Sequence, residues 1–229
     1  MINSYYALRM HISNLAKTHV SALLTILCLL SAAQTVYAEN PYFSADEISQ
    51  WRHKSFEGNT QYSLVDIDGK SAIEAGSKIS PSSLICQESV DLSKTPYLNW
   101  TWKVDQLPSG AASEKLMQGD DYGARIYIIF STGFGFWNAA SLNYVWSRQH
   151  AEEDSWINAF SDKVTMLVVE SGESNLKEWQ TYKRDVAADV KRYMGKDISK
   201  LKAVAIMTDS DNTQDTAKTY YGDIWFSAE

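Results

Sequence analysis

The chain has 229 residues, of which 45% are hydrophobic and 21% are charged, and its formal net charge is −7. This balance is typical of a globular protein and excludes a disordered chain, and the two cysteines exclude a disulfide-dense mini-protein. The acidic charge argues against nucleic acid as a partner, because proteins that bind a duplex carry a basic surface.

The N-terminal segment has the pattern of a secretory signal peptide. It begins with the cations Arg9 and Lys17 and no acid, continues with the apolar run 20–33, and reaches a small-residue cleavage pattern at Ala38. The apolar run is shorter than the ~20 residues that span a bilayer. We expect cleavage after Ala38 and a periplasmic or secreted protein; an uncleaved N-terminal anchor is the alternative. Residues 39–229 contain no further apolar stretch of that length, so we expect no membrane span in the mature chain.

Nine runs of the remaining chain have the residue pattern of β-strands, with turn residues between them. These runs are 60–67, 70–77, 97–104, 123–131, 140–147, 164–170, 179–185, 203–208 and 220–227. Asp68-Gly69 separates the first two and is a strong hairpin signal. Residues 185–194 have apolar side chains at helical spacing before Gly195, so they predict one short helix.

Strands without β-α-β alternation predict an all-β fold, a β-sandwich of the jelly-roll kind with one short helix. No linker, repeat or low-complexity tract interrupts residues 39–229. We therefore expect a single domain over these residues, preceded by a signal peptide over 1–38.

Several catalytic chemistries are excluded by residue counts. Beyond the signal segment the chain has two histidines, His53 and His150, and one cysteine, Cys86, which are too few for a compact zinc site. The chain has no G-x-S-x-G motif and no glycine-rich phosphate loop. Nucleotide, nicotinamide and flavin chemistry therefore have no visible site.

Asp120 and Asp121 form the first candidate site, where the polar segment 105–122 meets a strand. By strand spacing, Asp121 and Arg125 share a side, and an arginine keeps a neighbouring carboxylate ionised. Asp120, Asp121 and Arg125 are thus candidate catalytic or ligand-clamping residues. A structural ion pair that closes the loop is the alternative.

The acidic segment that starts at Asp209 has oxygen-bearing side chains at every second position and resembles a calcium loop. It lacks the central glycine and final glutamate of an EF-hand, and aspartate and asparagine also cap turns without a metal. A structural calcium at Asp209, Asp211 and Asp223 is one interpretation, and a metal-free turn is the other.

Two strands supply the candidate ligand-binding surface with their outward faces. Asn99, Thr101 and Lys103 alternate with tryptophans that we expect to be buried, and Arg125 and Tyr127 alternate in the same way in another strand. If these strands pair, they form a locally basic patch suited to a carboxylate- or sulfate-bearing glycan, because arginine binds oxyanions through two hydrogen bonds. A solvated sheet face is the alternative.

Aromatic side chains form another candidate binding feature. Phe134, Phe136 and Trp137 lie in a glycine-interrupted segment after a strand, where a flat platform for sugar rings can form. The alternative is a loop that packs these rings under the sandwich. The complete set of expected ligand-binding residues is Asn99, Lys103, Asp121, Arg125, Tyr127 and Trp137.

Several short motifs together resemble the exported bacterial family DUF3047, a domain of unknown function. They are Asn99-Trp-Thr-Trp-Lys103, Asp120-Asp-Tyr-Gly-Ala-Arg125, Tyr144-Val-Trp146, Ala205-Ile-Met-Thr-Asp-Ser-Asp-Asn-Thr213 and Tyr221-Gly-Asp-Ile-Trp-Phe226. The resemblance covers nearly all of the mature chain and implies no activity or catalytic residue. The late Gly-Asp-Ile-aromatic strand is also similar to galactose-binding-like jelly rolls, many of which bind carbohydrate.

The sequence therefore predicts an exported protein that binds a carbohydrate or a similar polar ligand on one face of a β-sandwich. One alternative is a glycan-active hydrolase or lyase that uses Asp120 or Asp121 with Arg125 and Lys103. A glycosidase needs a second carboxyl group, which Asp209 or Asp223 would supply. Another alternative is an envelope module that binds a second protein.

Overall fold

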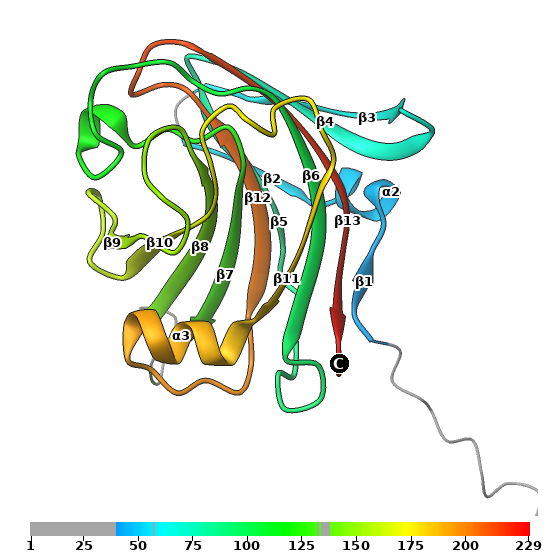
Figure 1. The fold of residues 1–229 in the computed structure, drawn as a ribbon. Helices are drawn as coiled ribbons and strands as arrows, with labels where there is room; N and C mark the ends of the chain where they lie inside the picture. Colours follow the sequence, from blue (N-terminus) through cyan, green and yellow to red (C-terminus); the bar gives the residue numbers. More distant parts are fainter. Residues whose placement is uncertain (1–39, 57, 132, 134–137) are drawn as a thin grey trace, which may run out of the picture. The chain divides into compact units, whose positions relative to one another are not determined.

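The computed structural model describes residues 40–56, 58–131, 133 and 138–229. Residues 40–229 form one compact unit built mainly of β-strands (Figure 1). Among the described residues, no helix has the length and apolar character needed to cross a membrane.

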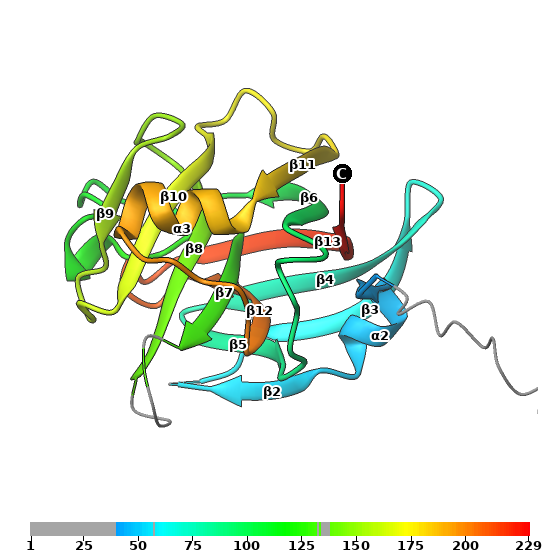
Figure 2. The ribbon, with the colours of Figure 1, turned by 90° about the horizontal axis from the view of Figure 1, so that it is seen from below.

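Two sheets stack face to face (Figures 1 and 2). The six-stranded sheet has the order β11 (Gln180–Asp185), β6 (Tyr97–Gln106), β13 (Thr216–Ser227), β4 (Lys70–Lys78) and β3 (Gln61–Ile67), with β1 (Tyr42–Phe43) also paired to β13. The seven-stranded sheet has the order β2 (Arg52–Ser55), β5 (Pro81–Cys86), β12 (Ala203–Asp209), β7 (Arg125–Ser131), β8 (Ala139–Ser147), β10 (Val164–Ser171) and β9 (Ser155–Ile157). This arrangement confirms the predicted all-β sandwich.

The core lies between the sheets because alternate residues of each strand point inward. Trp100 and Trp102 of β6 are fully buried, as are Tyr144 and Trp146 of β8. The ring of Trp100 stacks on that of Tyr144 with centroids 5.3 Å apart, so side chains of the two sheets meet directly. Stacked aromatic pairs add about 0.5–1.5 kcal/mol to what their burial contributes.

The predicted helix is present as α3 (Val186–Met194). Asp185 caps its first turn by accepting a hydrogen bond from the backbone N–H of Ala188, and Gly195 ends it with a φ of 67°. A second, short helix, α2 (Ala45–Ser49), was not predicted; Ser44 and Glu47 form a capping box at its start. A 3₁₀ turn, Met117–Gly119, lies in the polar segment 105–122.

All nine predicted strands are present, with ends shifted by a few residues, but β1, β2, β5 and β9 were missed. β1 and β9 have two and three residues, and every residue of β2 is exposed, so these strands carry little alternation. The Asp68-Gly69 hairpin is confirmed, since β3 and β4 pair across it.

One neighbouring pair breaks the antiparallel pattern. β10 runs parallel to β8, while the other pairings between named strands are antiparallel. A parallel pair needs a connection long enough to return the chain to its starting end. Residues 148–163, which include β9, make this connection.

Candidate functional site

The outer face of the seven-stranded sheet holds a pocket of about 480 Å³, here called the polar pocket. Strands β7, β8 and β12 form its floor, because residues that alternate with the buried core side chains point to this face. Other residues come from the segment before β7 and from the connection between β8 and β10. The side chains used below are Phe56, Asp120, Arg125, Tyr127, Asn143, Asn158, Phe160 and Asp209.

Among the described residues that line the polar pocket, Arg125 is the only buried cation. It is 4% exposed, and its Nη2 donates to the Asp209 carboxylate at 2.6 Å. The same guanidinium donates to the Tyr127 hydroxyl at 3.0 Å and to the Asp120 carbonyl at 3.3 Å. Its Nε has no hydrogen-bond partner among the described residues. The buried Arg125 therefore keeps an unpaired Nε–H in the pocket floor.

Asp209 balances the charge of Arg125. It is 3% exposed and also accepts a hydrogen bond from the backbone N–H of Tyr122 at 3.1 Å. Burial raises the pKa of this carboxyl above its ordinary value, and the Arg125 charge lowers it in part. Asp120 and Asp121 add further repulsion that favours the protonated form. The result is a buried ion pair whose acid is crowded by two others.

Asp120 contributes a second carboxyl group to the pocket. Both of its oxygens accept hydrogen bonds from Nδ2 of Asn158, at 2.9 and 2.8 Å. Burial raises the pKa of Asp120, while the Arg125 charge and the Asn158 hydrogen bond lower it. An acid with a raised pKa in a pocket can serve as a ligand contact or as a proton donor.

Asn143 lies in the floor on β8 and is fully buried. Its Nδ2 makes a long contact of 3.6 Å to the sulfur of Met166, and its Oδ1 has no partner among the described residues. Leaving a buried polar atom unpaired costs about 1–3 kcal/mol. A hydrogen-bond donor on a ligand in the pocket would satisfy this atom.

Two exposed phenylalanines border this polar floor. Phe56, which follows β2, is 56% exposed, and Phe160, in the β8–β10 connection, is 57% exposed. Tyr127 of β7 adds a third ring. The pocket thus combines flat apolar faces at its rim with hydrogen-bonding groups beneath.

Asp121 does not pair with Arg125, which corrects the predicted clamp. Its carboxylate accepts hydrogen bonds from the backbone N–H groups of Asn212 and Thr213, at 3.2 and 2.6 Å, and from both of their side chains. The alternation argument fails here because β7 begins only at Arg125, so residue 121 is outside the strand. Asp121 therefore braces the turn after β12, and the partner of Arg125 is Asp209.

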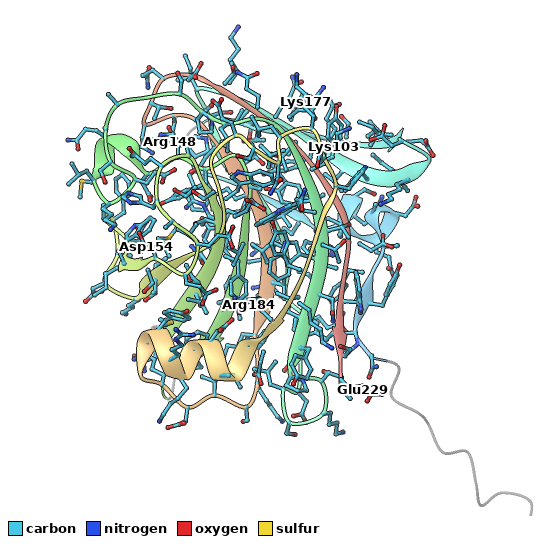
Figure 3. All side chains as sticks on the ribbon, in the orientation of Figure 1. Lys103, Arg148, Asp154, Lys177, Arg184 and Glu229 are labelled. Carbon is cyan, nitrogen blue, oxygen red and sulfur yellow. The ribbon has the colours of Figure 1, made fainter. Side chains whose placement is uncertain are left out.

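Lys103 and Asn99 do not share a face with Arg125, which corrects the predicted basic patch. They belong to β6 of the six-stranded sheet, whereas β7 belongs to the other sheet. Lys103, labelled in Figure 3, forms an ion pair with Asp68 at 2.7 Å, and Asn99 donates to Ser227 at 3.0 Å. Strands β6 and β7 are consecutive in the chain, but they belong to different sheets and therefore do not pair.

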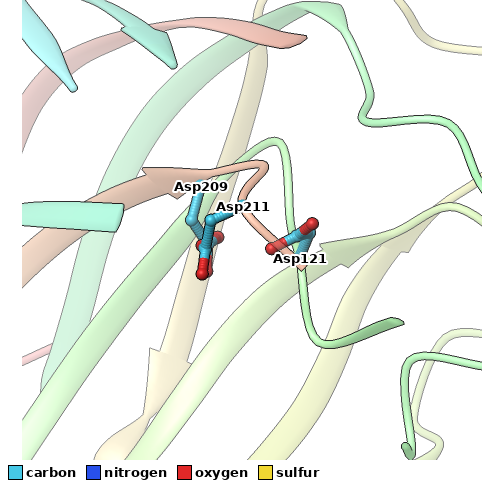
Figure 4. A group of neighbouring side chains, drawn as sticks. All are labelled: Asp121, Asp209 and Asp211. Atoms are coloured by element: carbon cyan, nitrogen blue, oxygen red, sulfur yellow. The ribbon is translucent and has the colours of Figure 1, made fainter. Parts of the chain in front are cut away.

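Of the expected calcium ligands, Asp209 and Asp211 come together and Asp223 does not. Asp223 is in β13, where it accepts hydrogen bonds from the Tyr42 hydroxyl and the backbone N–H of Ala45. Asp121 takes its place, and carboxylate oxygens of Asp121, Asp209 and Asp211 lie within 4.8 Å of one another (Figure 4). These three residues could hold a cation, but Arg125 and backbone N–H groups already serve two of the carboxylates.

The expected aromatic platform, Phe134, Phe136 and Trp137, lies outside the described residues. Sequence reasoning missed Phe56, Asn158 and Phe160, which lie in irregular segments without periodicity. The sequence pattern could have identified Asn143, because it lies between the buried Leu142 and Tyr144 and so points to the opposite face of the strand.

These features define an all-β sandwich with a ligand-sized pocket on the outer face of one sheet. The model of the family described as "Protein of unknown function (DUF3047)" matches residues 49–225, and the chain belongs to this family. The resemblance noted in the sequence is thereby confirmed. No curated protein sequence matches the chain.

Several solved structures are similar in fold. The family 30 carbohydrate-binding module of a cellulosomal cellulase from Clostridium thermocellum is 15% identical, with a TM-score of 0.45, covering 78% of this chain and 91% of that one. The xylan-binding module CBM86 from Roseburia intestinalis is 13% identical (TM-score 0.34; 82% and 94% covered). The xyloglucanase domain of a type three effector from Sinorhizobium fredii is 11% identical (TM-score 0.41; 82% and 97% covered). Similarity at this level concerns the fold and does not identify a ligand or a binding site in this chain.

Proposed function

We propose that the polar pocket binds a carbohydrate. The observation that carries the proposal is the pairing of exposed rings, Phe56 and Phe160, with a floor of buried polar groups. A sugar ring has an apolar C–H face that stacks on an aromatic side chain and hydroxyl groups that need hydrogen-bond partners. The pocket supplies both.

The polar floor matches the hydroxyl group in particular, because a hydroxyl donates and accepts. The unpaired Oδ1 of Asn143 requires a donor, and the unpaired Nε of Arg125 requires an acceptor. The carboxylate of Asp120, held by Asn158, offers further acceptor sites. The pocket therefore offers both kinds of partner within one cavity.

The test is a calorimetric titration of the protein with oligosaccharides of xylan, β-1,4-galactan and cellulose. We expect one of these to bind saturably and Phe160→Ala to weaken it about tenfold, since the stacked ring removes apolar surface from water and a tenfold change corresponds to about 1.4 kcal/mol. Leu64→Ala is the matched control, because Leu64 is also an exposed apolar side chain but lies on β3 of the other sheet. Absence of binding by every oligosaccharide, or equal loss in the control, would sink the proposal.

A hydrolase is the second candidate, and the raised pKa of Asp120 favours it. Asp120 and Asp209 line the same pocket, so a proton donor and a second carboxyl group are both present. Lys103 takes no part, because it belongs to the other sheet. Release of reducing ends from any of the oligosaccharides, abolished by Asp120→Asn, would favour the hydrolase; binding without product would favour the binding module.

A further inference from the structure

A second cavity of about 360 Å³ adjoins the polar pocket on the same outer face of the seven-stranded sheet. The two cavities share Lys54, Tyr127 and Val164, so they form neighbouring parts of one surface depression. We call the second cavity the basic pocket, after the four cations that line it. These cations are Arg52, Lys54, Lys163 and Lys202.

The basic pocket gathers like charges from separate parts of the chain. Arg52 and Lys54 alternate on β2, Lys163 directly precedes β10, and Lys202 directly precedes β12. All four side chains are exposed, and no aspartate or glutamate is among the described residues that line the cavity. Like charges brought together repel one another, so this arrangement favours an anion between them.

Several cations elsewhere on the described surface have acidic partners. Lys103 pairs with Asp68, Lys191 with Asp197 and Lys218 with Glu74. By contrast, Arg52 and Lys202 form no ion pair within the described part of the chain. The protein as a whole has a net charge of −7. A basic pocket in an acidic protein is a local feature that general surface charge does not explain.

Apolar side chains form part of the lining of the basic pocket. They include Ile85 of β5, Ile129 of β7 and Ala203 of β12, together with the shared Tyr127. Ring faces can rest on such side chains while their charged substituents meet the cations. The basic pocket thus resembles the polar pocket in combining apolar side chains with polar groups, and it adds positive charge.

We infer that the basic pocket binds the carboxylate or sulfate groups of an acidic glycan whose neighbouring sugar occupies the polar pocket. This inference rests on the proposed function and specifies its ligand class. Arg52 binds an oxyanion through two parallel hydrogen bonds, and the lysines supply charge from the sides.

The test compares a trigalacturonate, a sulfated trisaccharide and the neutral galactotriose by calorimetry at low and high salt. We expect an acidic trisaccharide to bind about tenfold tighter than the neutral one, with the advantage lost at high salt. Which acidic trisaccharide binds tighter identifies the anion. The double variant Arg52→Gln/Lys202→Gln should remove the advantage and leave the affinity for galactotriose unchanged, because neither residue lines the polar pocket.

The matched control is Lys94→Gln/Lys196→Gln, which removes two exposed cations that line neither pocket. Equal affinity for acidic and neutral trisaccharides would overturn the inference while leaving the proposed function intact, and so would an unchanged advantage in the double variant. No binding by any of these trisaccharides, together with no binding by the xylan and cellulose oligosaccharides, would overturn both. A short single-stranded oligonucleotide that binds as tightly as the acidic trisaccharides would also overturn the inference, because the site would then recognise polyanions in general.

Discussion

Arg125 and Asp209 form an ion pair inside the protein, and each charge is stabilised by the other. Both are less than 5% exposed, and their closest atoms are 2.6 Å apart. Charges removed from water are costly unless they are paired. The stability of the pocket floor therefore depends on the integrity of this pair.

We predict that Asp209→Asn destabilises the protein by about 3–5 kcal/mol, because it removes the carboxylate that pairs directly with the buried Arg125 charge. Urea unfolding would measure the change. Asp68→Asn is the control, because it also removes a carboxylate from an ion pair, here the one with Lys103. Asp68 is exposed, and the tight turn that contains it accepts asparagine readily. If both variants unfold at the same urea concentration, the buried pair has no special role.

Asp120 should make stability depend on pH. Burial raises its folded-state pKa above its ordinary value, which is about 4. From about pH 4 up to that raised value, the folded protein binds a proton that the unfolded chain has lost, so the free energy of unfolding falls as pH rises.

Asp120→Asn removes this group, and we expect its free energy of unfolding to fall less steeply with pH over that window. Chemical unfolding at a series of pH values would show the difference between the two proteins. His150, whose pKa burial lowers, contributes the opposite slope but does so equally in both. Parallel curves would contradict the prediction.

At the scale of elements, the β3–β4 hairpin shows local sequence and structure in agreement. Asp68 and Gly69 both have positive φ, 57° and 71°, as a tight two-residue turn requires. A Cβ added to Gly69 would meet no atom within 4 Å, so only the backbone conformation disfavours a side chain there.

We therefore expect Gly69→Ala to destabilise the protein by about 1 kcal/mol, measured by thermal unfolding. Gly76→Ala is the matched control. Gly76 lies in β4, its φ is not positive and a Cβ would also meet no atom within 4 Å. This control should be neutral or stabilising, and an equal loss in both variants would contradict the backbone argument.

Local agreement of this kind explains how much could be predicted. Long strands such as β6 and β7 alternate strongly, so their inward and outward residues follow from the sequence. Which sheet a strand joins depends on contacts between distant segments, and here the expected pairing of β6 with β7 was wrong. The candidate site was therefore half predicted: Arg125, Tyr127 and Asp120 line the pocket, whereas Lys103 and Asn99 lie elsewhere.

At the scale of the whole molecule, we propose that the chain is exported and trimmed. The basic start, the apolar run 20–33 and the small-residue pattern at Ala38 support this proposal. Mass spectrometry of protein from a Gram-negative host should show a mature N-terminus at Glu39 in the periplasmic fraction or the medium. Ala38→Lys should leave the precursor uncut, because the cleavage site requires a small residue. An untrimmed wild-type chain in the cytosol would contradict the proposal.

The parallel pairing of β8 and β10 has a consequence for how the polar pocket can vary. The return of the chain carries residues 148–163 across the outer face, where they deliver Asn158 and Phe160 to the polar pocket. Both core-facing layers are complete without these two side chains. Changes of length or composition in this one crossover would therefore reshape the polar pocket while the two sheets stay the same.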